Sequence, residues 1–201
     1  MNLRSLLAVP ALALALSFSA QAENKVKPGL YNIDPAHTTV GFTIEHFVIS
    51  IVSGRFNDVS GTIVLAEKIN DWKIDALVKT ASVDTGVAKR DDHLRSADFF
   101  ETSKYSDMRF VSKKISGSPN DFKITGDLTL KGVTKEITLK GKYRGVIMDS
   151  WKNQRIAIEA HGKINRKDFN VNYNDKFEGG PTVGDEVKIH LITEGTLASP
   201  K

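Results

Sequence analysis

The chain has 201 residues, no cysteine and a formal net charge of +4. That length is enough for a domain with a substantial hydrophobic core. Because cysteine is absent, neither a disulfide nor thiolate-bound zinc can support the fold, and burial must stabilise it. Lysine and arginine are spread among acidic residues and form no basic stripe interleaved with aromatic residues, so we expect no nucleic-acid partner.

The first residues are typical of a secretory signal peptide. Arg4 supplies the positive start, residues 6–18 form an apolar run, and Ala20-Gln21-Ala22 has the small-x-small form of a cleavage site. The run is shorter than the roughly 20 residues that a membrane-spanning helix needs, and no later segment is long and apolar enough to span. We therefore predict a signal peptide over residues 1–22, a single domain over residues 23–201, and a periplasmic location without a membrane span.

Most of the mature sequence is typical of β-strands with one dry face, because apolar and polar residues alternate. In chain order the alternation covers residues 40–48, 72–79, 122–131, 137–143, 156–164 and 187–191, and shorter strands are expected at 30–33, 60–66 and 108–115. Turn residues such as Asn70-Asp71 and Lys131-Gly132 separate these segments. Eight or nine antiparallel strands predict an all-β fold, either a sandwich or a closed barrel, and long strands with short turns favour an up-and-down barrel.

One segment departs from this pattern, since the sequence RDDHLRSADFF mixes acids, arginines and a histidine. Asp84 and Thr85 are candidate caps for a helix over about residues 87–98. Asp91 and Arg95 have the spacing of an i, i+4 ion pair on that helix. We expect an inserted helix that covers one end of the barrel.

The string Asp91-Asp92-His93 is a candidate site in this helix, because acids and histidine bind metals and transfer protons. Side chains one or two residues apart on a helix point in different directions, however, so these three do not converge. The other histidines, His37, His46, His161 and His190, have no spacing typical of a zinc site. We expect no metal site and no cofactor, unless ligands distant in the sequence converge in the fold.

Motifs of catalysis are absent from the sequence as well. It has no cysteine nucleophile and no Gly-x-Ser-x-Gly elbow. The glycine-rich stretch at residues 179–184 lacks the strand–loop–helix context and the Lys-Ser/Thr pair of a phosphate-binding loop. We therefore do not expect an enzyme.

The dry faces predict an internal cavity, because they include small residues that leave space: Ala76, Gly126, Gly141, Ala160 and Gly162. The predicted inner wall comprises Val40, Phe42, Ile44, Trp72, Ile74, Ala76, Val78, Phe110, Leu128 and Leu130. His46 lies on the same apolar strand face as Phe42 and Ile44. It is either a core histidine with a satisfied hydrogen bond or a polar contact for the head of an apolar ligand. The alternative to a cavity is a core that large side chains fill.

Motifs along nearly all of the mature sequence carry a family resemblance. They are YNIDPAHTTVGFTIEHF (31–47), GRFNDVSGTI (54–63), SVDTGVAKRDDHLRSADFF (82–100), GDLTLKGVTKEITL (126–139) and GKINRKDFNV (162–171), of which the third is the most specific. Together they resemble the YceI-like family of periplasmic lipid-binding proteins. The resemblance implies a lipocalin-like, eight-stranded antiparallel barrel with an inserted helix. It also implies that long isoprenoid or fatty amphiphiles bind in the barrel, with no shared catalytic reaction.

From these observations we predict a periplasmic binding or carrier protein for a long apolar amphiphile. The ligand would be a quinone-like polyisoprenoid or a fatty-acid-type lipid held inside the barrel. Two alternatives stay open: a barrel with a filled core that acts through protein partners in a stress response, and an enzyme that acts on a bound lipid. A homodimer also stays open.

Overall fold

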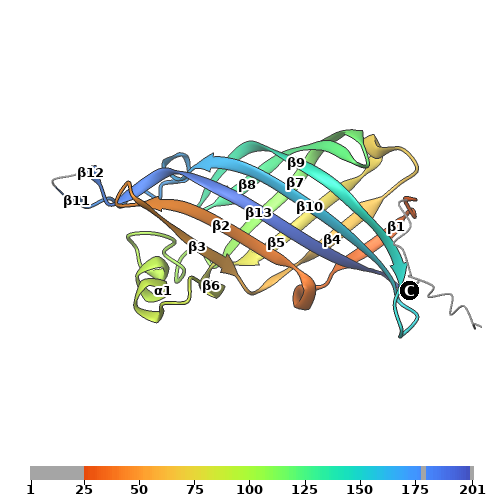
Figure 1. Ribbon diagram of the computed structural model, residues 1–201, viewed down its shortest axis with the longest axis horizontal. Helices are drawn as coiled ribbons and strands as arrows, with labels where there is room; N and C mark the ends of the chain where they lie inside the picture. Colours follow the sequence, from red (N-terminus) through yellow and green to blue (C-terminus); the bar gives the residue numbers. More distant parts are fainter. Residues whose placement is uncertain (1–24, 178–179, 200–201) are drawn as a thin grey trace, which may run out of the picture.

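An antiparallel β-sheet that closes on itself forms the body of the molecule (Figure 1). The structure is a computed structural model, and it describes residues 25–177 and 180–199. The predicted signal peptide, residues 1–22, lies outside the described residues. Among those that are described, no helix has the length and hydropathy of a membrane span.

Eight passes of the chain make up the barrel wall within the described residues. Three passes are bent, and each is divided into two strands: β1 (Gly29–Ile33) with β2 (Thr39–His46), β3 (Ser50–Phe56) with β4 (Val59–Leu65), and β5 (Lys73–Lys79) with β6 (Val83–Asp84). The other five passes are β7 (Asp107–Ser118), β8 (Asp121–Leu130), β9 (Val133–Met148), β10 (Gln154–Asn165) and β13 (Val183–Leu197).

Shorter elements connect and extend this wall. They are the helix α1 (Ala88–Arg95), the short strands β11 (Lys176–Phe177) and β12 (Gly180–Pro181), and the 3-10 turns η1 (Pro35–His37), η2 (Ile69–Asp71), η3 (Thr80–Ser82) and η4 (Arg166–Phe169). β11 and β12 pair with each other in a separate two-stranded ribbon. In Figure 1, α1 and this ribbon lie at the same end of the barrel, and β1 lies toward the other end.

Closure of the wall depends on β13. One edge of β13 pairs with β10, and its other edge pairs with β2 over residues 183–192 and then with β1 over residues 195–197. β1 also pairs with β4, so the ring is completed through β5, β7, β8, β9 and β10. The predicted eight-stranded antiparallel barrel is therefore confirmed.

The period-two pattern places the hydrophobic core inside the barrel. In β8, Phe122, Ile124, Leu128 and Leu130 are all buried, and lysine, threonine and aspartate alternate with them on the outer face. The same alternation gives buried Ile156, Ile158 and Ala160 in β10. The apolar faces predicted from the sequence are the inner faces of the barrel.

The sequence pattern missed β3, which pairs with β2. Two residues hide its alternation. Position 54 points inward, and it is occupied by glycine because a β-carbon there would overlap the ring of Phe42. Ile51 points outward and is 62% exposed although it is apolar. The inward and outward faces of β3 therefore do not differ in polarity as those of β8 do.

The strand predicted over residues 40–48 ends earlier, at His46, because the chain turns over residues 47–49. Phe47 and Val48 have φ angles of 51° and 64° in this turn. Glycine and asparagine are the usual residues in such left-handed positions. The apolar residues here gave no turn signal, so the prediction carried the strand too far.

The inserted helix α1 is confirmed, but it is shorter than the predicted residues 87–98, and neither Asp84 nor Thr85 caps it. Its first flanking residue is Val87, whose side chain makes no capping hydrogen bond. Thr85 instead donates from its backbone N–H and its hydroxyl to Oδ1 of Asp91, at 2.9 and 2.5 Å, and Asp91 is buried. The helix is thus tied to the preceding loop through its own aspartate.

The predicted Asp91–Arg95 ion pair does not form. Arg95 pairs with Asp92 at 2.9 Å, and it also donates to the carbonyls of Ala81 and Val83 at 2.8 and 2.9 Å. Backbone carbonyls of the loop therefore compete successfully for a guanidinium that helical spacing alone would assign to Asp91. The charges of this segment fasten α1 to the end of the barrel.

Four large aromatic residues fill the barrel at the end away from α1: Tyr31, Trp72, Phe122 and Tyr143. The Trp72 ring packs edge-on against Phe122 and Tyr143, with centroids 5.5 and 5.9 Å apart, and its Nε1 donates to the Ala66 carbonyl at 2.9 Å. Burial raises the pKa of Tyr143 to about 12, so its hydroxyl stays protonated. We refer to these four residues as the aromatic plug.

Replacing Trp72 with alanine should destabilise the protein strongly, because a void would open in the aromatic plug and the Ala66 carbonyl would lose its donor. Loss of a buried tryptophan or phenylalanine side chain typically costs about 3–5 kcal/mol. Urea unfolding followed by circular dichroism measures this loss. Trp72→Phe, which keeps a ring in the plug, should cost clearly less; equal losses for both variants would contradict the packing role.

Candidate functional site

A cavity of about 620 Å³ lies inside the barrel. Its lining is largely aliphatic and aromatic, and it does not include the aromatic plug. Pockets that hold small molecules span roughly 300–1,000 Å³ and are mostly apolar. The filled-core alternative requires side chains to occupy this space, so the cavity contradicts it.

Ten of the eleven residues predicted for the ligand site line this cavity. They are Val40, Phe42, Ile44, His46, Ile74, Ala76, Val78, Phe110, Leu128 and Leu130. Trp72 is not among the lining residues, because it lies in the aromatic plug. Its phase in the alternation is inward, but its position along the barrel axis is beyond the end of the cavity.

The small inward residues behave in two different ways. Ala76 and Ala160 line the cavity. The inward glycines do not leave free space, because large side chains lie against them and, at Gly126, the backbone of β7 does so as well. A β-carbon would lie 2.7 Å from Cζ of Phe110 at Gly126 and 2.5 Å from Cδ2 of Leu139 at Gly162, and at Gly141 it would overlap the ring of Phe122. The prediction that these glycines open the cavity is therefore wrong.

The sequence prediction also left out part of the wall. Ile158 of β10 and Ile189 of β13 line the cavity, and both belong to alternating segments whose phase could have identified them. Leu94 on α1 and Phe99 and Phe100 beyond it also contribute. These last three come from a helix and an irregular segment, where no period-two signal exists.

The cavity opens at the end where α1 lies. Four residues of its lining are exposed: Glu45, Val87, Lys89 and His93. All four belong to the β2–β3 hairpin or to α1 and its flanks, which Figure 1 shows at one end of the barrel. We call this opening the mouth; the aromatic plug lies at the other end.

Arg166 organises the chain on one side of the mouth. This buried guanidinium donates from Nε to the Gly184 carbonyl at 2.7 Å and from Nη1 to the carbonyls of Val171 and Tyr173 at 2.6 and 2.7 Å. Burial lowers the pKa of Arg166, but from a value so high that the group stays charged. It thereby fixes the segment between β10 and β13, which carries several lining residues.

Two histidines lie at the mouth. His93 contacts Asp98, with Nε2 and Oδ2 2.8 Å apart, and its ring packs edge-on against Phe99 and Tyr173. The ring of His46 packs against Phe47 with centroids 4.1 Å apart. Among the described residues the His46 side chain has no hydrogen bond, and both interpretations of this residue, a core histidine or a polar contact for a ligand, stay predictions.

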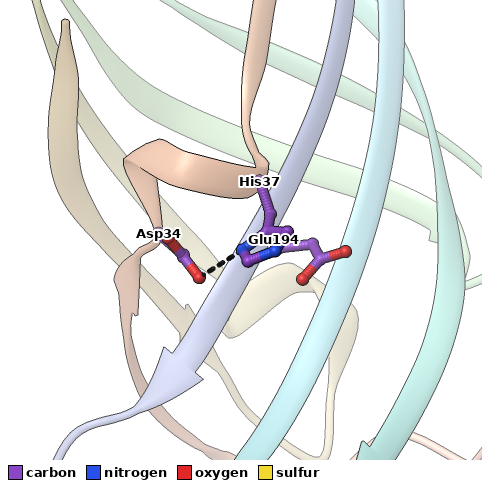
Figure 2. A group of neighbouring side chains, drawn as sticks. All are labelled: Asp34, His37 and Glu194. Carbon is purple, nitrogen blue, oxygen red and sulfur yellow. Dashed lines mark hydrogen bonds and ion pairs between the residues drawn. The ribbon is translucent and has the colours of Figure 1, made fainter.

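Three side chains of metal-ligand types, which the sequence spacing did not predict to converge, lie together where β1, η1 and β13 meet (Figure 2), and none of them lines the cavity. Asp34, His37 and Glu194 bring one ligand atom each to within 4.8 Å of one another, with Nδ1 of His37 2.8 Å from Oδ2 of Asp34. Arg155 already supplies positive charge here: its Nη1 lies 2.5 Å from Oδ2 of Asp34 and 3.3 Å from Oε2 of Glu194, and its Nε lies 2.8 Å from Oδ2 of Asp149. The geometry is that of an ion-pair network which ties the bend between β1 and β2 to β10 and β13.

The fold and the cavity define a β-barrel that encloses an apolar ligand space. A family model described as the YceI-like domain matches residues 31–194. Protein YceI of Escherichia coli is 43% identical over 168 residues, covering 82% of this chain and 85% of that protein. The chain belongs to the YceI-like family, as the motifs predicted.

Solved structures share this fold. The Campylobacter jejuni YceI protein superposes with a TM-score of 0.68 at 36% identity, covering 83% of this chain and 96% of that one. A polyisoprenoid binding domain from Saccharophagus degradans superposes with a TM-score of 0.65, covering 86% of this chain and 100% of that one. Its identity is 17%, so this second likeness shows the fold alone.

The Asp34–Arg155 pair should contribute stability that depends on pH. The hydrogen bond from Arg155 is the main cause that lowers the pKa of Asp34 from 3.8 to about 2, with further contributions from His37 and the N–H of Ala36. Stability from a lowered carboxyl pKa is present above the unfolded value and is lost as the pH falls through the folded value. Asp34→Asn should therefore cost on the order of 2 kcal/mol at neutral pH.

Chemical denaturation of both proteins between neutral pH and about pH 2 measures this effect, and the difference should shrink below about pH 4. Glu159→Gln is the control, because Glu159 forms an exposed ion pair with Arg144 at 3.6 Å, and such pairs contribute little. A difference that is independent of pH would contradict the ion-pair explanation.

Proposed function

We propose that the protein binds a long apolar amphiphile in its barrel and carries it without chemical change. The observation that supports this best is the cavity of about 620 Å³, which has an apolar wall and opens at one end. The structural relative from Saccharophagus degradans is described as a polyisoprenoid binding domain. A quinone-like polyisoprenoid or a fatty-acid-type lipid is the ligand class we propose, because the long apolar chain of either one matches the apolar wall of the cavity.

The apolar chain of such a ligand supplies the affinity. Each methylene group moved from water to apolar surroundings contributes about 0.8 kcal/mol, so about ten carbons contribute on the order of 8 kcal/mol, before the cost of immobilising the chain. The wall residues Val40, Phe42, Ile44, Ile74, Ala76, Val78, Phe110, Leu128 and Leu130 would contact this chain. In this proposal Trp72 supports the closed end and does not touch the ligand.

The polar head of the ligand would lie at the mouth. Among the charged residues of the lining that the structure describes, Lys89, Arg90 and Arg166 are cationic and Glu45 is acidic. His46 has a ring without a hydrogen bond among the described residues and is the polar contact we propose for the head group. The signal peptide predicted over residues 1–22 supports a periplasmic carrier, and a homodimer is compatible with this function.

Ala76→Phe tests whether the cavity is the ligand site. Ala76 lines the cavity, so the added ring should occupy ligand space and abolish binding of a long-chain quinone while the ligand-free protein keeps its melting temperature. At a hundredfold excess over the dissociation constant, ligand should stabilise the wild type by about 2.7 kcal/mol. Thermal melting of delipidated proteins, each with and without the quinone, measures both effects.

Leu77→Phe is the matched control, because Leu77 is the next residue of β5 and lies outside the cavity lining. It should keep the ligand-dependent rise in melting temperature. A wild type that is indifferent to lipid, together with a strongly destabilised Ala76→Phe variant, would contradict the carrier function. Mass spectrometry of lipid that co-purifies with the native protein would then identify the ligand where binding is found.

A further inference from the structure

The tip of the β2–β3 hairpin is apolar and exposed. Phe47, Val48, Ile49 and Ile51 are 40%, 59%, 90% and 62% exposed. Polar residues are the usual ones at hairpin turns, and single exposed apolar residues need no explanation, whereas a contiguous group marks an interaction surface. We call these four residues the apolar tip.

The backbone of the apolar tip is strained as well. Val48 is β-branched, yet its φ of 64° lies in the left-handed region, where such residues are rare. Asparagine or glycine would satisfy this turn at lower cost. The turn therefore keeps apolar side chains where stability alone would favour other residues, and backbone strain of this kind is found at functional sites.

The apolar tip continues directly into the mouth of the cavity. Ile44 and His46 precede it on β2 and Val52 follows it on β3, and all three line the cavity. The N–H of Phe47 donates to the carbonyl of Thr182 at 2.9 Å, and Thr182 is a lining residue on the other side. The apolar tip is therefore directly adjacent in the chain to residues of the cavity lining on both β2 and β3.

We propose that the apolar tip inserts into the surface of a lipid bilayer and places the mouth against it. This inference rests on the proposed function, because an amphiphile that fits the cavity is stored in bilayers and has to pass between a bilayer and the barrel. Side chains at the head-group boundary bury apolar area without a membrane span. The tip makes the contact, and the ligand then moves through the mouth without its apolar chain crossing water.

A second exposed apolar hairpin, which lies away from the mouth, provides a control for the proposal. Residues 147–151 at the β9–β10 hairpin include Ile147, Met148 and Trp151, at 49%, 64% and 77% exposure. This hairpin lies at the opposite end of the barrel from the β2–β3 hairpin (Figure 1), and its exposed residues are not part of the cavity lining. It offers a comparable apolar surface without a mouth.

The test uses the double variant Ile49→Ser, Ile51→Ser and the control Trp151→Ser, in the otherwise complete chain. Sedimentation with phosphatidylcholine vesicles, with and without phosphatidylglycerol, measures the partition coefficient. The double variant should lose about tenfold or more, which corresponds to about 1.4 kcal/mol, and the control should bind as the wild type does. Equal losses in the control and the double variant, or no binding of the wild type to either vesicle, would overturn the proposal.

Uptake of a long-chain quinone separates this inference from the proposed function. The double variant should take up quinone from detergent micelles as the wild type does, but should take it up at least about tenfold more slowly from vesicles. Loss of both would place the tip in ligand binding itself and overturn the docking role. If the wild type takes up no quinone from micelles, the carrier function fails, while vesicle sedimentation still decides the docking role.

Two further measurements distinguish bilayer docking from a structural role of the tip and from dimerisation through it. Val48→Gly should raise the melting temperature, because glycine relieves the left-handed strain, and should lower vesicle binding; a fall in both would assign the tip a structural role and contradict the proposal. Light scattering of the double variant should match the wild type. A change in oligomeric state would show that a second copy of the chain covers the tip, which overturns the proposal.

Discussion

The register of β13 determines whether this barrel has an apolar interior. β13 is hydrogen-bonded on both edges, and it closes the ring by pairing with β10 on one side and with β2 and then β1 on the other. Val187, Ile189 and Leu191 face the cavity in this register. A slip by one residue would turn them outward and direct Lys188 and His190 inward, since side chains alternate along a strand. The ion pairs of Arg155 with Asp34 and Glu194 fasten the same region, so hydrogen bonding and electrostatics favour one register.

Much of the fold could be predicted from the sequence, because most strands have one polar face toward solvent and one apolar face toward the interior. In β8 every outward residue is polar and the inward ones are apolar or glycine, so the alternation is unambiguous. The β2–β3 hairpin could not be predicted in the same way. Its turn has no glycine or asparagine, its outward face carries Ile51, and Gly54 is explained by the position of the Phe42 ring, a contact between strands that local pattern does not contain.

The sequence could predict which side chains of the site point into the barrel, but not their position along the barrel axis or the contacts between strands. Alternation states whether a side chain points inward, but not how far along the axis it lies, and for this reason Trp72 was assigned to the cavity wall although it belongs to the plug. Small inward residues were expected to create space, but Gly141 is occupied by the ring of Phe122, which enters from the neighbouring strand. The mouth depends on Arg166 and on the segment whose carbonyls it binds, and these contacts arise only in the folded chain.

Because the aromatic plug fills one end of the barrel, a ligand inside it has a single route in and out. The aromatic plug blocks passage through the barrel, so a chain held inside enters and leaves by the same opening. In the proposed carrier role, donor and acceptor therefore have to use the mouth in turn, and the compartment that supplies ligand competes with the one that receives it. Net flow then follows the difference in chemical potential of the ligand between the two, and the barrel itself sets only the rate.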